Sequence, residues 1–78
     1  MSYLFNHSES FNQDLSAWDV GNVTDMTSMF YNAFQFNQDL SSWNVSNVTS
    51  CYEFCRSTDS WDLPKPNFTN CSDFLGCD

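Results

Sequence analysis

The sequence predicts an α/β repeat protein, a short solenoid of strand-plus-helix units that ends in a cysteine-rich C-terminal cap. Three observations predict this class. A 25-residue pattern recurs, each copy passes from a strand-like to a helix-like hydrophobic pattern, and all four cysteines lie in the last third of the chain. A unit of this length cannot bury its own hydrophobic faces, so neighbouring units are expected to stack around one core.

The repeat is visible when the chain is compared with itself at a shift of 25 residues. Eleven of the 14 positions in Phe11–Thr24 are identical to their counterparts in Phe36–Thr49. A degenerate last copy sets Asn67 opposite Asn47 at a shift of 20, after a linker that contains two prolines. The predicted organisation is a repeat region, 1–57, and a cap, 58–78. The repeat region comprises a partial unit, 1–10, and the units 11–35 and 36–57.

Each unit opens with a segment that is typical of a buried strand. Large apolar residues, with aromatic and β-branched types among them, occupy the same positions of this segment in both copies. They are Leu15, Trp18 and Val20 in the first copy and Leu40, Trp43 and Val45 in the second. The two tryptophans are either core residues or a binding stripe on the surface. The inward period of the strand favours the core.

The second half of each unit has the spacing of a short helix. Apolar residues recur at i, i+3, i+4 and i+7, which places them on one helical face: Met26, Met29, Phe30 and Ala33. The equivalent residues that precede the helical segments are favoured N-cap types: Asp25, Ser50 and Asn70. Ser50 and Glu53 together resemble a capping box.

The repeat contains a long motif that is similar to that of a known family: F-N-Q-D-L-S-x-W-D/N-V-x-N-V-T-x-M-x-x-M-F. This run resembles the BspA-like leucine-rich repeats, also called the DUF285 or mycoplasma lipoprotein repeat. The resemblance implies a leucine-rich-repeat-like solenoid on secreted or surface-anchored proteins, with roles in adhesion and protein binding and no catalysis. The chain departs from it by its small number of units and by its cysteine- and proline-containing end, so binding surfaces do not carry over directly.

Composition and charge exclude several classes of protein. The 78 residues are 41% hydrophobic, which is too apolar for a disordered tail, and ten acidic against two basic residues give a net charge of −8. This charge repels the phosphates of nucleic acids and of anionic membranes. No apolar run approaches the roughly 20 residues of a membrane span, and the first ten residues do not resemble a signal peptide. We expect neither a nucleic-acid partner nor membrane insertion.

The cysteines predict disulfides and therefore an extracellular or cell-surface location. Their spacings lack the C-x-x-C pattern that is common at zinc sites, which makes metal ligands and free thiols the less favoured alternatives. Cys51 and Cys71 share a repeat position, so the predicted pairs are Cys51–Cys71 and Cys55–Cys77. The distance between neighbouring units leaves the crossed pairing open.

The sequence predicts no catalytic, cofactor or metal site. His7 is the only histidine, its repeat equivalent is Asn32, and it lies far from the cysteines, so no base is placed beside a nucleophile. Asp14 and Asp39 should stack in neighbouring units, but no run supplies the about six to eight oxygen ligands that calcium requires. These carboxylates are expected to be solvated or to cap backbone N–H groups.

Asn-x-Ser/Thr sequons are the remaining chemical motif, and they become candidate N-glycosylation sites if a eukaryote secretes the protein. They lie at Asn6, Asn22, Asn44, Asn47, Asn67 and Asn70. An alternative role exists for Asn22 and Asn47, which share one repeat position. In this alternative, Asn-Val-Thr turns the chain and the asparagine hydrogen-bonds the backbone.

The first of two predicted functions is a non-enzymatic extracellular or cell-surface scaffold for protein–protein interaction or adhesion. One unit carries an aromatic pair, Tyr31 and Phe34, beside its buried face, and the equivalent later positions are Arg56 and Asp59. An exposed aromatic pair in a single unit is a candidate contact surface.

The alternative function is a structural protomer that stacks end to end into an extracellular filament. The first unit begins at its predicted helix, so Met1, Leu4 and Phe5 have no preceding unit to cover them. Either a preceding unit or another subunit is expected there. In the second case the partner surface would be Phe74 and Leu75 of a neighbouring copy, in a contact that does not close.

Overall fold

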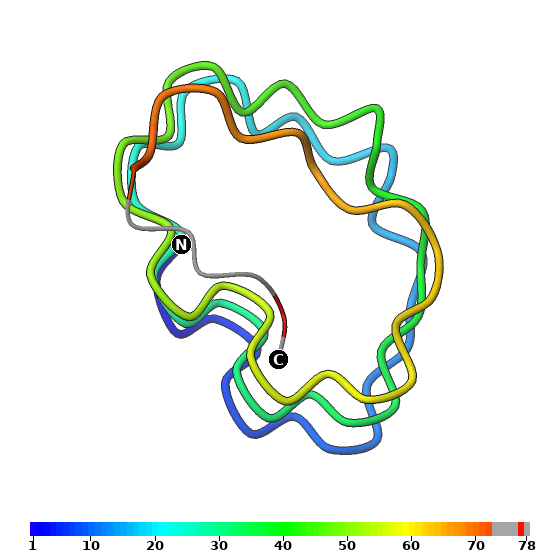
Figure 1. Ribbon diagram of the computed structural model, residues 1–78. Coiled ribbons are helices and arrows are strands. Elements are labelled where there is room, and N and C mark those ends of the chain that lie inside the picture. The colour runs from blue at the N-terminus through cyan, green and yellow to red at the C-terminus, as the bar shows by residue number, and fades with distance from the viewer. Residues whose placement is uncertain (73–76, 78) are drawn as a thin grey trace.

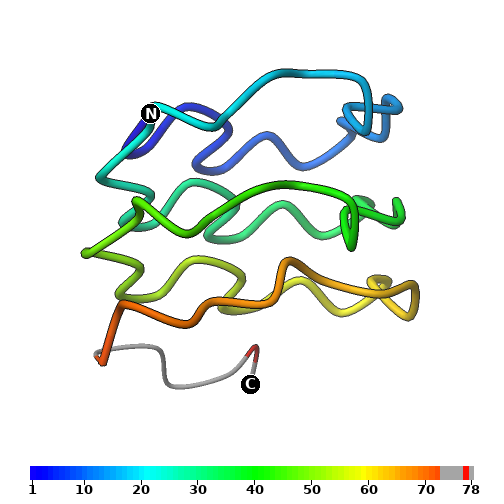
Figure 2. The same ribbon diagram turned by 90° about the horizontal axis from the view of Figure 1, so that it is seen from above.

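The chain winds in three stacked layers, each of which we call a coil. The computed structural model describes residues 1–72 and Cys77, and the layers lie one on another in two perpendicular views (Figures 1 and 2). Coil 1 is 1–25, coil 2 is 26–50 and coil 3 is 51–70. These described residues contain no helix and no strand, and a single parallel bridge joins Asp25 to Ser50. The predicted α/β architecture of strand-plus-helix units is therefore wrong.

A run of tight turns, 27–32, stands where the sequence predicts a helix. Ser28 and Asn32 have positive φ values of 54° and 63°, which a right-handed helix excludes. Alternate N–H groups bond to carbonyls of coil 3 at 2.8–3.0 Å, from Ser28, Phe30 and Asn32. The N–H of Met26 continues this series and donates at 2.8 Å to the carbonyl of Ser50, the last residue of coil 2. The N–H groups between them close four-residue turns within coil 2, each bonding to the carbonyl three residues earlier, from Met29, Tyr31 and Ala33. The backbone is thus paired between coils and not along a helix axis.

The turn run and a helix bury nearly the same residues, which explains the wrong prediction. Residues with positive φ recur every four positions in each coil, at Tyr3 and His7, Ser28 and Asn32, and Glu53 and Ser57. A period of four differs little from the helical period of about 3.6 over eight residues. The predicted face is accordingly buried, and Met26, Met29, Phe30 and Ala33 are all fully inaccessible.

The predicted strands are also segments broken by tight turns. The N–H of Trp18 donates to the carbonyl of Leu15, and the N–H of Val23 donates to that of Val20, each at 3.0 Å. Coil 2 repeats both turns at the equivalent positions. Each turn brings one apolar side chain inward, so the burial of Leu15 and Val20 follows the prediction without a strand.

Exposed carboxylates stabilise these turns from outside. Asp14 accepts the N–H of Ser16 at 2.9 Å, which lowers the pKa of Asp14 below its ordinary value of 3.8. Asp39 accepts the hydroxyl of Ser41 at 2.6 Å and its N–H at 3.0 Å, and these bonds lower the pKa of Asp39 as well. Both side chains therefore fix local backbone geometry.

The predicted helix cap Asp25 serves a turn instead, because no helix follows it, and none follows Ser50 within residues 51–72. The segment after the third predicted cap, Asn70, lies mostly outside the described residues. Asp25 accepts the N–H of Thr27 at 2.9 Å, and this bond lowers the pKa of the carboxyl. Glu53 does not complete a capping box with Ser50. Its carboxylate forms an ion pair with Arg56 at 2.9 Å.

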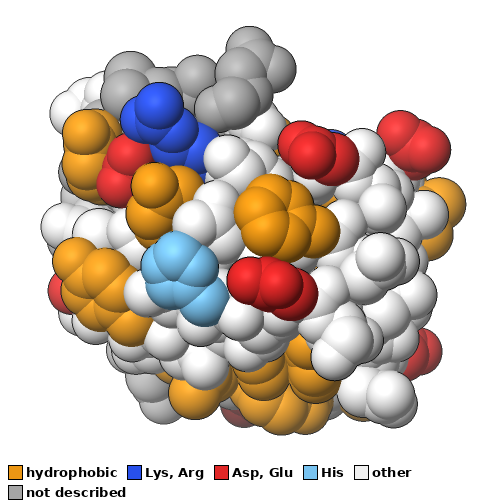
Figure 3. All heavy atoms as spheres, turned by 90° about the horizontal axis from the view of Figure 1, so that it is seen from below, with side chains coloured by type: hydrophobic (Ala, Val, Ile, Leu, Met, Phe, Trp, Pro, Cys, Tyr) orange, Lys and Arg blue, Asp and Glu red, His pale blue; other side chains and the backbone are white. Residues whose placement is uncertain are grey.

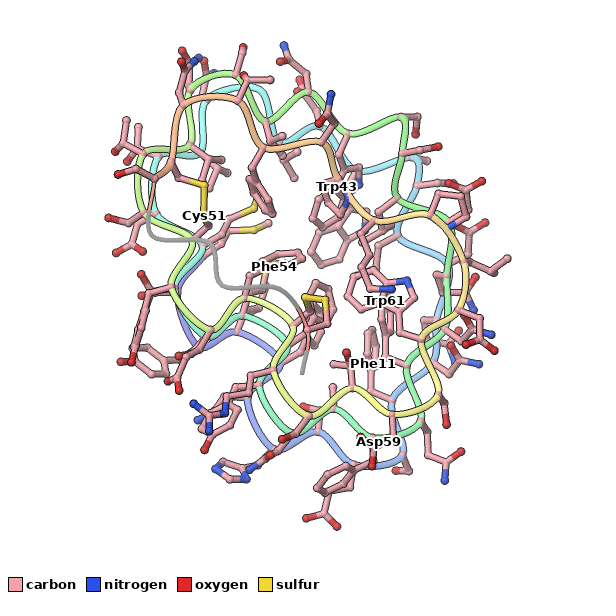
Figure 4. The ribbon with its side chains drawn as sticks, viewed as in Figure 1. Phe11, Trp43, Cys51, Phe54, Asp59 and Trp61 are labelled. Carbon is pink, nitrogen blue, oxygen red and sulfur yellow. A yellow bond between two sulfur atoms is a disulfide. The ribbon has the colours of Figure 1, made fainter. Side chains whose placement is uncertain are left out.

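Aromatic side chains from all three coils fill the interior. Trp43, Phe54 and Trp61 point into the ring (Figure 4), and Phe30 lies at their centre. The ring centroid of Phe30 is 4.4 Å from that of Phe36. Besides Met26, Met29, Phe30 and Ala33, the buried core residues are Leu15, Val20, Phe36, Leu40, Trp43, Val45, Val48, Cys51, Phe54, Cys55 and Trp61.

The 25-residue register persists into coil 3. Asn12 accepts the N–H of Asn37 through Oδ1 at 2.8 Å. One coil later, Asn37 accepts the N–H groups of Asp62 and Leu63 at 2.9 and 3.0 Å. A column of asparagine side chains therefore joins the three coils.

The register shortens before the last described residues, and one detail differs from the sequence alignment. Asn47 donates through Nδ2 to the carbonyl of Gly21 at 2.6 Å. Asn70 makes the same kind of bond to the carbonyl of Ser46. Asn70 thus takes the structural role of Asn47, which the alignment had given to Asn67.

Two disulfides fasten the end of the chain to coil 3. The pairs are Cys51–Cys71 and Cys55–Cys77, as predicted, with Cα–Cα distances of 6.1 and 4.7 Å. Both distances lie within the range of about 4.4–6.8 Å that a disulfide spans. Cys51 and Cys55 occupy the repeat positions of Met26 and Phe30, so covalent bonds take the place of apolar stacking at this end.

Candidate functional site

The principal candidate site is the open end of coil 1, which we call the N-terminal face and define by Met1, Leu4, Phe5, Phe11 and Trp18. Leu4 is 49% and Trp18 43% exposed, and the other three are partly buried. In coil 2 the equivalents of the last four are covered: Trp43 is 5% exposed, and Met29, Phe30 and Phe36 are inaccessible. Coil 1 therefore presents side chains of core type to the outside.

The rings of the N-terminal face form a stack on Phe5. The Phe5 centroid lies 4.2 Å from that of Phe11, in parallel planes, and 5.9 Å from that of Trp18. On the inner side, Phe5 stacks on Phe30 at 5.4 Å. Packing from one side holds the rings in place, which makes the face a preformed apolar platform.

Sequence reasoning found part of this platform and missed the rest. Met1, Leu4 and Phe5 were predicted as contact residues, and the structure brings them together at one end. Phe11 and Trp18 were not included, because Trp18 was assigned to the core. Both lie one repeat before a core residue, and no described coil covers them from the outer side, so the same alignment contained the signal.

The predicted aromatic pair lies on the side of the stack and not at an end. Tyr31 is half-buried against His7, with ring centroids 5.6 Å apart, whereas Phe34 is 36% exposed. The side view in Figure 3 shows hydrophobic side chains in separate spots with acidic side chains between them. The amide Nδ2 of Asn32 lies 3.1 Å from Nδ1 of His7, so the histidine bonds to its own repeat equivalent.

The sequon asparagines differ in what their side chains bind. Asn47 and Asn70 use Nδ2, the atom that carries an N-linked glycan, for the bonds between coils described above. Asn44 accepts the N–H and the hydroxyl of Ser46 through Oδ1. The others are Asn6, whose Oδ1 is buried without a partner among the described residues, and the exposed Asn22 and Asn67. Glycosylation stays a prediction at all six.

Several further features concern only the described part of the chain. Phe74 and Leu75, the predicted contact residues at the other end, lie outside it. Within it there is no pocket and no group of three potential metal ligands. No helix there is long and apolar enough to span a membrane.

The coils and the open platform together define a repeat protein of stacked 25-residue turns. The chain belongs to the family described as "Mycoplasma protein of unknown function, DUF285", whose model matches residues 1–73. This match confirms the DUF285 resemblance, whereas the link to leucine-rich repeats stays a prediction. No curated protein and no solved structure gives a significant match to the chain.

Proposed function

We propose that the chain is a non-enzymatic scaffold, extracellular or on a cell surface, that binds other proteins through the N-terminal face. The observation that carries this proposal is the contrast between Trp18, which is 43% exposed, and its equivalent Trp43, which is 5% exposed. Large apolar side chains grouped on a rigid surface are typical of protein interfaces.

Two further observations support the location and the rigidity of the scaffold. Both disulfides are of the kind that persists in an oxidising compartment, which favours the outside of the cell. Phe5 is held between Phe11 and Phe30, so the platform loses little conformational freedom when a partner covers it.

Photo-crosslinking on intact cells tests this proposal. With a benzophenone amino acid at position 4, we expect one discrete protein adduct on the surface of cells that produce the protein. Excess unlabelled protein should compete for this adduct, whereas the Trp18→Asp variant should not. The matched control carries the same probe at position 35, where Gln35 is exposed on the side of the stack. Equal labelling from both positions, or no adduct from position 4, would contradict the proposal.

A second candidate function is the end-to-end filament, which the exposure of the same platform favours. In that case another copy covers Leu4 and its neighbours. Burial of one Leu or Phe side chain is worth roughly 1.5–3 kcal/mol, so a few residues suffice for micromolar association after the entropic cost.

A charged residue introduced into the N-terminal face distinguishes the two proposed functions. Leu4→Asp is expected to abolish self-association in sedimentation velocity, because it places an unpaired carboxylate against apolar side chains. Gln35→Asp adds the same charge on the side of the stack and should leave association unchanged. The filament function would be ruled out if the wild-type chain stayed monomeric at high concentration, or if the Leu4→Asp variant still associated.

A further inference from the structure

The side of the stack carries an exposed aromatic ring in its middle coil. Phe34 is 36% exposed, and of the large apolar side chains that are exposed among the described residues it is the only one in coil 2. The neighbouring layers, coils 1 and 3, lie on either side of it (Figure 2). The exposure of Phe34 is therefore a property of the side of the stack, with a described coil before and after it.

The repeat places one acidic residue on each side of this ring. Glu9 and Asp59 are the equivalents of Phe34 at shifts of 25 residues, and both are exposed. The register holds at this place, because the equivalent aromatic residues two positions later have ring centroids 5.7 and 4.8 Å apart: Phe11, Phe36 and Trp61. We call Glu9, Phe34 and Asp59 the side column.

The side column presents an apolar ring between two negative charges. Layers that are joined by backbone hydrogen bonds lie about 4.7–4.9 Å apart, so the backbone positions of Glu9 and Asp59 are separated by about 10 Å, with Phe34 midway. Asp59 points away from the interior, whereas Phe11 points into it (Figure 4). The side view in Figure 3 shows a hydrophobic side chain with an acidic side chain on either side of it.

Glu9 and Asp59 differ from most other acidic residues in what their carboxylates bind. Four aspartates each accept the N–H of the residue two positions later: Asp14, Asp19, Asp25 and Asp39. Glu53 forms an ion pair with Arg56. Within residues 1–72 and Cys77, the carboxylates of Glu9 and Asp59 accept no hydrogen bond and form no ion pair. The described fold does not use these two charges, which leaves them available to a partner.

The chain supplies no cation of its own for the side column. It contains two basic residues, Arg56 and Lys65. The guanidinium of Arg56 is bound to Glu53 at 2.9 Å. Lys65 donates through Nζ to the carbonyl of Trp61 at 2.8 Å and lies 5.1 Å from the centre of its ring. A second copy of this chain has the same two engaged cations, so the complementary charge has to come from a different protein.

We infer that the side column is a docking site for an arginine side chain of another protein. A planar guanidinium stacks on the exposed ring of Phe34 and directs its N–H groups to the carboxylates of Glu9 and Asp59. A lysine ammonium is a compact charge without such a plane, and an apolar side chain would cover both carboxylates without neutralising them. The net charge of −8 attracts a basic partner over a longer range. This surface is separate from the N-terminal face, so the inference goes beyond the proposed function.

An NMR titration of the oxidised full-length protein with N-acetylarginine amide tests the inference. We expect saturable shift changes at the ring of Phe34 and at the backbone amides of the side column, with the weak affinity of a single residue. N-acetylcitrulline amide has nearly the same shape without the charge and should cause no saturable change. Nα-acetyllysine amide should bind less tightly than the arginine probe. Equal binding of either control, or no response at Phe34, would overturn the inference.

Variants of the protein separate a defined site from a general attraction between opposite charges. Asp59→Asn removes one carboxylate and should weaken binding of the arginine probe about 1.4- to 5-fold, as expected for an exposed ion pair. Asp62→Asn is the matched control. It removes the same charge from an exposed residue whose repeat equivalents are Asn37 and Asn12, and it should leave binding unchanged. Equal losses in the two variants would show that only the net charge matters and would overturn the site.

The aromatic ring is tested by two substitutions of Phe34 that keep the position apolar. Phe34→Leu loses the π face and should weaken binding about 2- to 5-fold. Phe34→Trp offers the aromatic ring that cations prefer and should strengthen it. Binding that is the same in both variants would overturn the stacking of arginine on residue 34.

The side column and the N-terminal face are scored independently. Trp18→Ala changes only the N-terminal face and should leave binding of the arginine probe unchanged. In the crosslinking experiment, a partner held at the side column gives its own adduct from position 35. That adduct differs in mass from the adduct at position 4 and is lost in the Asp59→Asn variant. Failure of the titration would overturn the side column, whereas a competed adduct at position 4 would still support the proposed function.

Discussion

Phe30→Ala is expected to lower the free energy of unfolding by about 3–5 kcal/mol. Phe30 is inaccessible to solvent, and its ring contacts aromatic rings of all three coils, among them Phe5, Phe36 and Phe54. The substitution leaves a cavity at the centre of the stack, where no side chain can move in without uncovering another. Urea denaturation followed by tryptophan fluorescence measures the loss.

The matched control is Phe5→Ala, at the equivalent position of coil 1. Phe5 is only partly buried, and no described coil covers its outer side, so its removal should cost clearly less than the removal of Phe30. Equal losses would mean that the stacking of coils does not determine where the stability lies. For a chain of 78 residues a loss of 3–5 kcal/mol is a large share of the total, so the measurements are best made on the oxidised protein at low temperature.

Reduction of the disulfides is expected to open the C-terminal end first, from Trp61 onward. Each bond closes a loop, with sequence separations of 20 and 22 residues, and should contribute on the order of 2–4 kcal/mol by restricting the unfolded chain. Hydrogen exchange followed by mass spectrometry should show early exchange in this part under reducing conditions, while coils 1 and 2 stay protected.

A double variant controls for the reducing agent. Cys55→Ser with Cys77→Ser retains the Cys51–Cys71 bond and should show a smaller part of the same effect. Earlier exchange in coil 1 than in the residues after Trp61 would contradict the prediction. It would place the weakest point of the stack at the N-terminal face, where one side of the coil is uncovered.

The sequence was informative about spacing and composition but not about backbone conformation. The period, the buried positions and the pairing of Cys51 with Cys71 all follow from comparing the copies. The turn runs could not be predicted, because burial at Met26, Met29 and Phe30 suits a period of four as well as 3.6. Residues with positive φ are usually recognised by glycine. In this chain such positions are taken by side chains as different as Tyr3 and Glu53.

The candidate site was predicted in outline and missed in its chemistry. The exposure of Leu4 and Phe5 follows from counting units, and this needs no knowledge of the backbone. The donors and acceptors around them depend on which N–H points to which neighbouring coil. A helix would have used those N–H groups internally. The direction of the backbone hydrogen bonds at this face therefore became apparent only from the structure of the turns.

The asparagine column and the turn runs impose a rule on how the chain can change length. Each coil is tied to the next at offsets of 24 to 26 residues, from Tyr3 through Asp62. Insertion of a single residue in coil 1 or coil 2 would change the offset of every tie whose two residues lie on opposite sides of the insertion. Whole 25-residue duplications keep all of them. After Asp62 no further described coil is tied to coil 3 at this offset, and in that part of the chain the repeat is shorter than 25 residues. Growth by complete repeats, with irregular lengths confined to the final coil, is thus built into the hydrogen bonds themselves.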